Sequence, residues 1–315
     1  MKKNFIVLAL AAAALASCNG GFKKGDGGLL YNIHTDKSGS NIAVGDFAIM
    51  DMVLKNDGDS ILKSTYEMGM PQYMIVPKSE MKGDVFSALP LLSEGDSVTV
   101  KIPSDSIFKG RPKPPGFKSK YVIYDIKVEK VIPKGKLTDQ QFQEKYMAYV
   151  KSQMEVIKNQ EGAKIDKYIA DNKLKPTKTA TGLYYIVTKP GSGPVPNAGD
   201  TVVVNYTGKF FNGKVFDTSN KDEAQKNKIF NPQNPYQPIR FPVGQTKVIP
   251  GWDQGLMLLN KGSKATFIVP SSLAYGEQGS QPVIAPYTPL VFDVELIDII
   301  HGAPATAATP APAKK

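Results

Sequence analysis

The stretch from Val248 to Leu259 places the tightest constraint on what this chain can fold into. It contains Trp252, the only tryptophan among 315 residues. Pro250 suits the first turn of a helix, where its missing N–H costs little. Trp252, Leu256 and Leu259 then recur at i, i+4 and i+7, which predicts one apolar face of a short helix. Because strand-like segments lie on both sides, this helix is expected to pack against a sheet.

The first residues have the composition of a secretory signal peptide. Two lysines precede an apolar run that ends near Ala14, and the run is too short to span a membrane. The only cysteine, Cys18, follows Leu15-Ala16-Ser17. This arrangement resembles the bacterial lipoprotein signal, which implies that residues 1–17 are removed and that Cys18 is lipidated. The alternative is an ordinary signal peptide beside an incidental thiol.

The charge of the chain does not indicate a nucleic-acid partner. The 39 basic and 29 acidic residues give a net charge of +10, and removal of two lysines with the signal peptide leaves +8. The lysines are scattered among acids, whereas nucleic-acid binding needs a basic cluster. Such a surface suits anionic components of a cell envelope. The two histidines, His34 and His301, are isolated, so we expect neither a metal site nor a cofactor.

Composition divides the rest of the chain into segments. Gly, Ser and Lys are frequent before about residue 40, which predicts a flexible tether. Strand-like segments of β-branched residues then occur in two regions separated by a helical one. The Ala, Pro and Thr tail cannot form a core. The predicted limits are a lipidated tether at 18–40, a first β-rich domain at 41–133, a helical linker at 134–176, a second β-rich domain at 177–301 and a disordered tail at 302–315.

The linker begins with a helix-capping pattern. Thr138-Asp139-Gln140-Gln141 matches a capping box with Thr138 as the N-cap. Apolar residues follow at roughly helical spacing, with Gly162 interrupting them, so we expect one or two amphipathic helices. Their apolar stripe is expected to pack against a domain or a partner chain. The linker helices or the first domain therefore offer a surface through which a homodimer can form.

The two β-rich regions share short sequence patterns in the same order. Gly45-Asp46 opens a strand as Gly199-Asp200 does, and Ile102-Pro103-Ser104 matches Val269-Pro270-Ser271. These matches predict one fold that is used twice.

Six blocks of the second region, in order, closely resemble the FKBP-type peptidyl-prolyl cis-trans isomerases over about residues 180–300. The blocks are Asn205-Tyr206-Thr207-Gly208, Val215-Phe216-Asp217-Thr218-Ser219, Phe241-Pro242-Val243-Gly244, Val248-Ile249-Pro250-Gly251-Trp252, Leu273-Ala274-Tyr275-Gly276 and Leu290-Val291-Phe292-Asp293-Val294-Glu295-Leu296. The resemblance implies an α+β fold in which a curved antiparallel sheet wraps a short helix, here present in two copies joined by a helical linker. Trp252 would form the floor of a pocket between sheet and helix.

Prolyl isomerisation requires a pocket of this kind. Rotation about an X–Pro bond loses amide resonance and meets a barrier near 18–20 kcal/mol. No bond breaks, so no nucleophile or metal is needed, and the catalyst has to bind the twisted amide better than the planar one. A twisted amide resembles a ketone, so an apolar cleft with one or two oriented donors suits it.

The resemblance also assigns residues of this sequence to roles. It implies that the Ile249 N–H and the Tyr275 hydroxyl donate to substrate carbonyls, and that Asp217 orients Tyr206 or polarises the amide. These three are the expected catalytic residues. The expected substrate-binding residues are Tyr206, Phe216, Ile239, Phe241, Val248, Trp252, Val283, Ile284 and Phe292. Taken alone, Trp252 and Tyr206 would more often be core residues, and their place in these blocks is what favours the pocket.

The first β-rich region lacks these chemical groups. Through the repeat, the tryptophan position falls at Val85, the tyrosine near Met52, the phenylalanine at Leu62 and the carboxylate at Lys63. We therefore expect a degenerate FKBP-like domain without isomerase activity.

Residues 220–238 interrupt the family pattern with three prolines and many polar residues. They are expected to form either a solvated loop or a lip that contacts substrate beyond the proline.

The function predicted from the sequence is isomerisation of X–Pro bonds in envelope or secreted proteins. The expected partners are proline-containing proteins and, through the N-terminal lipid, a bacterial membrane, with the outer membrane favoured and a periplasmic or surface-facing location. The alternatives are a chaperone or scaffold that binds proline-containing or unfolded segments with little turnover, and a structural surface lipoprotein.

Overall fold

A computed structural model describes residues 21–108, 112–113 and 117–301. The chain divides into two compact units, with the boundary after Tyr146. The expected signal peptide, the expected lipidation site Cys18 and the expected disordered tail at 302–315 lie outside the described residues.

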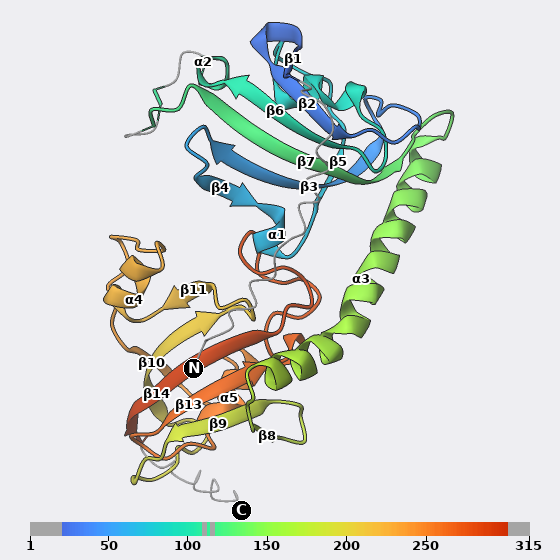
Figure 1. The fold of residues 1–315 in the computed structure, drawn as a ribbon. Coiled ribbons are helices and arrows are strands. Elements are labelled where there is room, and N and C mark those ends of the chain that lie inside the picture. The colour runs from blue at the N-terminus through green and yellow to red at the C-terminus, as the bar shows by residue number, and fades with distance from the viewer. Residues whose placement is uncertain (1–20, 109–111, 114–116, 302–315) are drawn as a thin grey trace, which may run out of the picture. The chain divides into compact units, whose positions relative to one another are not determined.

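The first unit is built on a seven-stranded antiparallel sheet (Figure 1). Its strands run in the order β1-β2-β6-β7-β3-β4, and β5 pairs with β3. Their bounds are β1 Lys23–Lys24, β2 Leu30–Thr35, β3 Phe47–Asn56, β4 Ile61–Ser64, β5 Gln72–Ile75, β6 Ser97–Pro103 and β7 Tyr121–Ile132. Two short helices, α1 (Thr65–Met68) and α2 (Ser104–Ile107), and three 3-10 turns (Asp26–Gly28, Val85–Ser87 and Leu89–Leu91) complete it.

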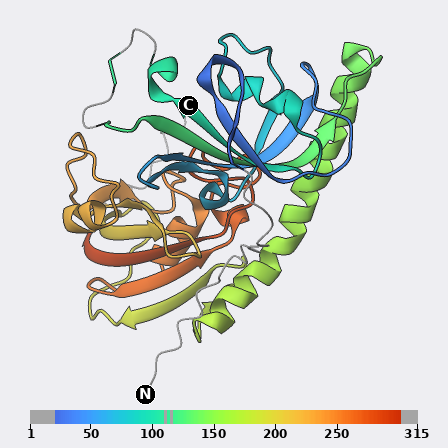
Figure 2. The same ribbon diagram turned by 45° about the horizontal axis from the view of Figure 1, so that its top comes forward.

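The second unit contains another seven-stranded antiparallel sheet, whose strands run from yellow-green to red in Figure 2. Their order is β11-β10-β14-β13-β9-β8, and β12 pairs with β10. The strands are β8 Thr177–Lys178, β9 Tyr184–Lys189, β10 Thr201–Lys209, β11 Val215–Thr218, β12 Ile239–Pro242, β13 Lys264–Val269 and β14 Leu290–Ile300. The short helices are α4 (Lys221–Lys226) and α5 (Pro250–Leu256), and a 3-10 turn spans Ser271–Leu273.

The two sheets have the same topology, strand for strand. β1 to β7 occupy the places of β8 to β14, and the ladder shifts register between Ile49 and Met50 just as it does between Val203 and Val204. The Met52 N–H donates to a Thr65 hydroxyl at 2.9 Å, as the Tyr206 N–H donates to Ser219. The predicted α+β class and the double use of one fold are confirmed.

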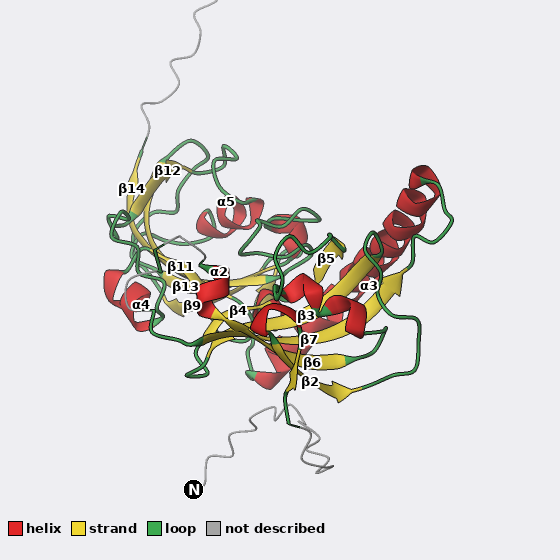
Figure 3. Cartoon of the chain, turned by 90° about the horizontal axis from the view of Figure 1, so that it is seen from above, coloured by secondary structure: helices red, strands yellow, loops and turns green. Residues whose placement is uncertain are grey.

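Helix α5, which is labelled in Figure 3, packs its apolar residues against one side of the second sheet. Leu256 and Phe267 are fully buried there, together with Val204 from β10. Gly255 allows the close approach, because a Cβ at that position would lie 2.7 Å from the Phe267 ring. The helix starts at Pro250 as predicted and ends at Leu256, and Leu259 completes the buried face from the turn that follows.

The first unit has no counterpart of α5 as an α-helix. The matching segment forms the 3-10 turns Val85–Ser87 and Leu89–Leu91, the second of which contains Pro90. Val85, at the position of the tryptophan, packs against the core of the first unit.

The predicted flexible tether at 18–40 is wrong for its second half. Residues Leu30–Thr35 form strand β2, which pairs with β6 from Leu30 to Thr35. Tyr31 and Ile33 pack against the core of the first unit, and apolar contacts and ladder hydrogen bonds hold the segment in place.

The linker is one α-helix, α3, from Asp139 to Asp171. The Thr138 N–H donates to the Gln141 side chain at 3.1 Å, and the Gln141 N–H donates to the Thr138 hydroxyl at 3.3 Å, which is the predicted reciprocal cap. The expected interruption at Gly162 does not occur, because a single exposed glycine costs a long helix only about 1 kcal/mol.

The 220–238 segment is not simply a solvated loop. Asn220 caps helix α4 by accepting from the N–H groups of Asp222 and Glu223, and Ala224 is fully buried. Further along, the Phe230 and Tyr236 rings stack at 5.4 Å. The segment therefore has a local structure of its own.

Candidate functional site

An aromatic cleft of about 500 Å³ lies between the second sheet and the N-terminal end of α5. The sheet contributes side chains from β10, β11, β12 and β14, and the remainder come from α5, the segment before it and the loop after the Ser271–Leu273 turn. Its lining consists of Tyr206, Phe216, Asp217, Ile239, Lys247, Val248, Ile249, Pro250, Trp252, Ala274, Tyr275 and Phe292.

The rings of the cleft meet edge to face around the indole of Trp252. Tyr206 stands at 5.1 Å and 76° to it, and Phe292 at 5.3 Å and 87°. Phe216 in turn meets Phe292 at 5.7 Å and 88°. Edge-to-face pairs fix ring orientation beyond what burial alone achieves, so the cleft has a defined shape.

Trp252 forms the floor of the cleft. Trp252 is only 4% exposed, yet it is among the residues that line the cleft, as expected of a buried floor. The indole N–H is buried and has no hydrogen-bond acceptor among the described residues. A buried donor without an acceptor is unusual in a folded protein, which makes this floor distinctive.

Asp217 is held in one orientation by two donors. The Tyr206 hydroxyl donates to its Oδ2 at 2.7 Å, and the Thr218 N–H donates to its Oδ1 at 2.9 Å. Burial raises the pKa of Tyr206, and the hydrogen bond to Asp217 and its charge raise it further. Tyr206 therefore stays a neutral donor across the physiological range, and Asp217 faces the cleft as a fixed carboxylate.

Two donors at the cleft are free to bind a ligand. Neither the Ile249 N–H nor the Tyr275 hydroxyl has a partner within the described part of the chain. Burial raises the pKa of Tyr275, and the charge of Asp217 adds to this effect, so its hydroxyl also stays protonated. The cleft thus presents two neutral donors beside an apolar floor.

The raised pKa of Tyr206 predicts a loss of stability in alkali. The ordinary pKa is 10.0, and below it the phenol is protonated in both the folded and the unfolded chain. Above it the unfolded chain loses the proton first, so the free energy of unfolding should fall as pH rises through the folded pKa. Urea unfolding at pH 8 and pH 10.5 should show a smaller fall for Tyr206→Phe than for the wild type. An equal fall in both proteins would contradict this assignment.

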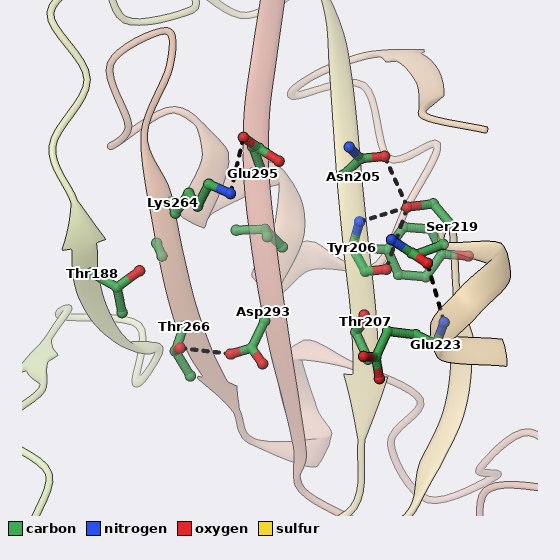
Figure 4. A pocket seen from close by; sticks show the side chains of 13 residues that line it. Thr188, Asn205, Tyr206, Thr207, Ser219, Glu223, Lys264, Thr266, Asp293 and Glu295 are labelled. Carbon is green, nitrogen blue, oxygen red and sulfur yellow. Dashed lines mark hydrogen bonds and ion pairs between the residues drawn. The ribbon is translucent and has the colours of Figure 1, made fainter. Parts of the chain in front are cut away.

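A second hollow of about 400 Å³ lies on the opposite face of the same sheet (Figure 4). Most of its side chains are polar, and several of them bind one another. Lys264 pairs with Glu295 at 3.2 Å, and the Thr266 hydroxyl donates to Asp293 at 2.7 Å. Because these groups already bind each other, the hollow offers few free donors, and Tyr206 is the one aromatic residue among those that line it.

Comparison with known proteins identifies the second unit. Residues 193–297, which include every residue that lines the aromatic cleft, match the family model of the FKBP-type peptidyl-prolyl cis-trans isomerases. The second unit belongs to this family. A probable FKBP-type isomerase, FkpA, of Neisseria meningitidis is 39% identical over 188 residues, which cover 57% of this chain and 63% of the relative. FkpA of Escherichia coli K12 is 37% identical over 194 residues, 58% of this chain and 64% of the relative.

The match to these FKBP-type relatives is partial in length. The chain spans slightly under two thirds of each of these curated relatives. Among solved structures, the crystal structure of FkpA from Escherichia coli is 34% identical, covering 52% of this chain and 74% of that one with a TM-score of 0.38.

Nine of the twelve predicted site residues line the cleft of this FKBP-type unit. The other three do not. Phe241 is 8% exposed and packs behind the floor, with its ring 6.1 Å from that of Trp252. Ile284 is 3% exposed and packs in the hydrophobic core, whereas Val283 is 48% exposed.

Three lining residues of the FKBP-type unit were missed by the sequence reading, namely Lys247, Pro250 and Ala274. Each is a direct neighbour of a predicted residue, so proximity in the sequence was the available signal. Lys247 is notable because it places a cation at the rim of a cleft predicted to be nearly free of charge. None of residues 220–238 is among the lining residues, so the lip hypothesis stays a prediction.

Proposed function

We propose that this chain catalyses the cis-trans isomerisation of X–Pro bonds in protein substrates. The observation that carries the proposal is the aromatic cleft itself, where an apolar floor lies beside two free neutral donors. This geometry fits a proline ring and the carbonyls on either side of it. Membership of the FKBP family supports the same activity.

The cleft can lower the rotational barrier by differential binding. As the amide twists, its resonance is lost and its carbonyl becomes less polar than in the planar state. Desolvation costs more free energy for the polar planar amide than for the twisted one. An apolar cleft therefore favours the twisted form. The Ile249 N–H and the Tyr275 hydroxyl would hold the flanking carbonyls, and Asp217 would fix Tyr206 and face the rotating group.

Replacing Asp217 with alanine should lower kcat/KM for a prolyl peptide about tenfold, which corresponds to roughly 1.4 kcal/mol. The reason is that Tyr206 loses a charged acceptor, and hydrogen bonds to charged groups are the stronger class. A protease-coupled assay on the full chain measures this effect. Glu295→Gln, in the polar hollow on the opposite sheet face, is the matched control and should leave the rate unchanged. Equal rates in the wild type and Asp217→Ala would argue against the proposed role of Asp217.

A binding module with little turnover is the less favoured function. The free donors and the fixed carboxylate are arranged to bind a small group inside the cleft. A scaffold would need only an exposed surface to which its partners bind. For the first unit we propose a role without isomerase activity, as a spacer, a dimerisation element or a chaperone surface. Met52, Leu62 and Lys63 stand there in place of the tyrosine, the phenylalanine and the carboxylate, and Leu62 is exposed.

The proposed setting is a bacterial cell envelope, with Cys18 carrying a lipid anchor and the outer membrane as the favoured site. The composition of residues 1–17 and the position of Cys18 support this proposal. No helix within the described ranges is long and apolar enough to cross the bilayer. Proline-containing envelope or secreted proteins would be the substrates, and α3 or the first unit would provide a homodimer contact.

A further inference from the structure

The C-terminal part of α3 belongs to the FKBP-type unit rather than to a free linker. From Met147 onward the helix falls within the second compact unit. Ile165 is 4% exposed, and the Tyr168 ring stacks on Phe211 at 4.3 Å and 17°. Phe211 lies in the turn that joins β10 to β11, the two strands that carry Tyr206 and Asp217. The helix thus packs on the part of the unit that builds one wall of the cleft.

Glu161 of α3 accepts two hydrogen bonds from Ser271, which precedes the cleft-lining residues Ala274 and Tyr275. Its Oε1 accepts from the Ser271 N–H at 2.5 Å, and its Oε2 accepts from the Ser271 hydroxyl at 2.6 Å. Ser271 is only 3% exposed, so this carboxylate satisfies two donors that would otherwise be buried without a partner. Hydrogen bonds to an ionised acceptor are about twice as strong as neutral ones.

Ser271 anchors the residues that follow it. Its carbonyl accepts from the N–H groups of Ala274 and Gly276, which lie on either side of Tyr275. Tyr275 therefore projects from a tight turn whose first residue is fixed by Glu161. A shift of Ser271 would move the Tyr275 hydroxyl, one of the two free donors of the cleft.

The serine at the equivalent position of the first unit has a different hydrogen-bond partner. Ser104, in the matching Ile-Pro-Ser sequence, is buried and donates its hydroxyl to the Ser119 carbonyl at 2.7 Å. That serine is satisfied by a neighbouring loop. Only the unit with the aromatic cleft uses a helix carboxylate for this purpose within the described residues.

We infer that Glu161 is a positioning residue for the cleft, holding the Tyr275 hydroxyl in place through Ser271. This inference rests on the proposed isomerase function. It assigns α3 a part in catalysis, because the helix supplies the acceptor that fixes the donor loop. An isomerase unit that begins at residue 177 would lack this acceptor.

The test is a double-mutant cycle in the full chain with a prolyl peptide as substrate. Glu161→Ala should lower kcat/KM about fivefold, and Tyr275→Phe should lower it by a similar factor. If Glu161 acts through Tyr275, the double variant should be little worse than either single variant. Glu161→Gln should stay near the wild-type rate, because the amide can accept from the N–H and donate to the hydroxyl of Ser271. Asp166→Ala, an exposed acid on the same helix, is the matched control and should have no effect.

Amide hydrogen exchange provides a readout that does not depend on turnover. Residues 271–276 should exchange faster in Glu161→Ala than in the wild type and the control, with the rest of the unit unchanged. An active wild type with an equally active Glu161→Ala, or with strictly additive losses in the double variant, would overturn the inference and leave the proposed function standing. A wild type without isomerase activity would overturn the proposed function and this inference together.

Discussion

Replacing Trp252 with alanine is expected to reduce kcat/KM for prolyl peptides by about tenfold to a hundredfold, and the free energy of unfolding by about 3–5 kcal/mol. The indole is 4% exposed and contacts the rings of Tyr206, Phe241 and Phe292. Its removal opens a cavity under the site, so the proline ring loses its floor and the edge-to-face pairs lose their common partner.

The two effects of this substitution can be separated. Trp252→Phe keeps an aromatic floor and should retain more activity and more stability than the alanine variant. Because Trp252 is the only tryptophan, circular dichroism rather than tryptophan fluorescence should follow unfolding. A folded Trp252→Ala variant with wild-type activity would show that the floor takes no part in catalysis.

Gly255→Ala is expected to destabilise the FKBP-type unit by about 1–3 kcal/mol, although alanine favours a helix over glycine by about 0.5–1 kcal/mol. Steric overlap outweighs helix propensity here, because the added Cβ would lie 2.7 Å from two atoms of the fully buried Phe267 ring. Either α5 must move away from the sheet or Phe267 must turn. Both changes would disturb the cleft that α5 helps to form.

Gly162→Ala is the matched control for this prediction. Gly162 lies inside α3, is exposed, and apart from its chain neighbours and the helix's own backbone no atom lies within 4 Å of the position of an added Cβ. The same substitution should therefore stabilise the protein by about 0.5–1 kcal/mol through helix propensity alone. Thermal or urea unfolding of both variants provides the comparison. Stabilisation by Gly255→Ala would contradict the close packing of α5 on the sheet.

Much of the fold could be predicted from the sequence because its signals are local or repeated. The helix at Pro250 and the cap at Thr138 have fixed spacings, and the matching patterns in the two halves correspond to two sheets of one topology. Strand β2 was missed because none of its residues is fully buried, so it shows no clean alternation. Helix α4 was missed because six residues are too few to establish a helical period.

Nine of the twelve residues that the family resemblance pointed to line the cleft. Local sequence could not distinguish rings that line the cleft from those that pack behind it. Phe241 and Ile284 were expected in the cleft, yet both side chains are buried in the core. The contact of Glu161 with Ser271 joins residues 110 positions apart, and no spacing rule reports such a pair.

Exchange spectroscopy by NMR on a peptide with one X–Pro bond tests the central claim most directly. It measures cis-trans exchange at equilibrium and does not require a protease. With catalytic amounts of the full chain, we expect exchange much faster than the tens to hundreds of seconds of the free peptide, and slower exchange with Trp252→Ala. Peptide signals that shift on binding while exchange stays at the uncatalysed rate would contradict the account and indicate a binding module instead.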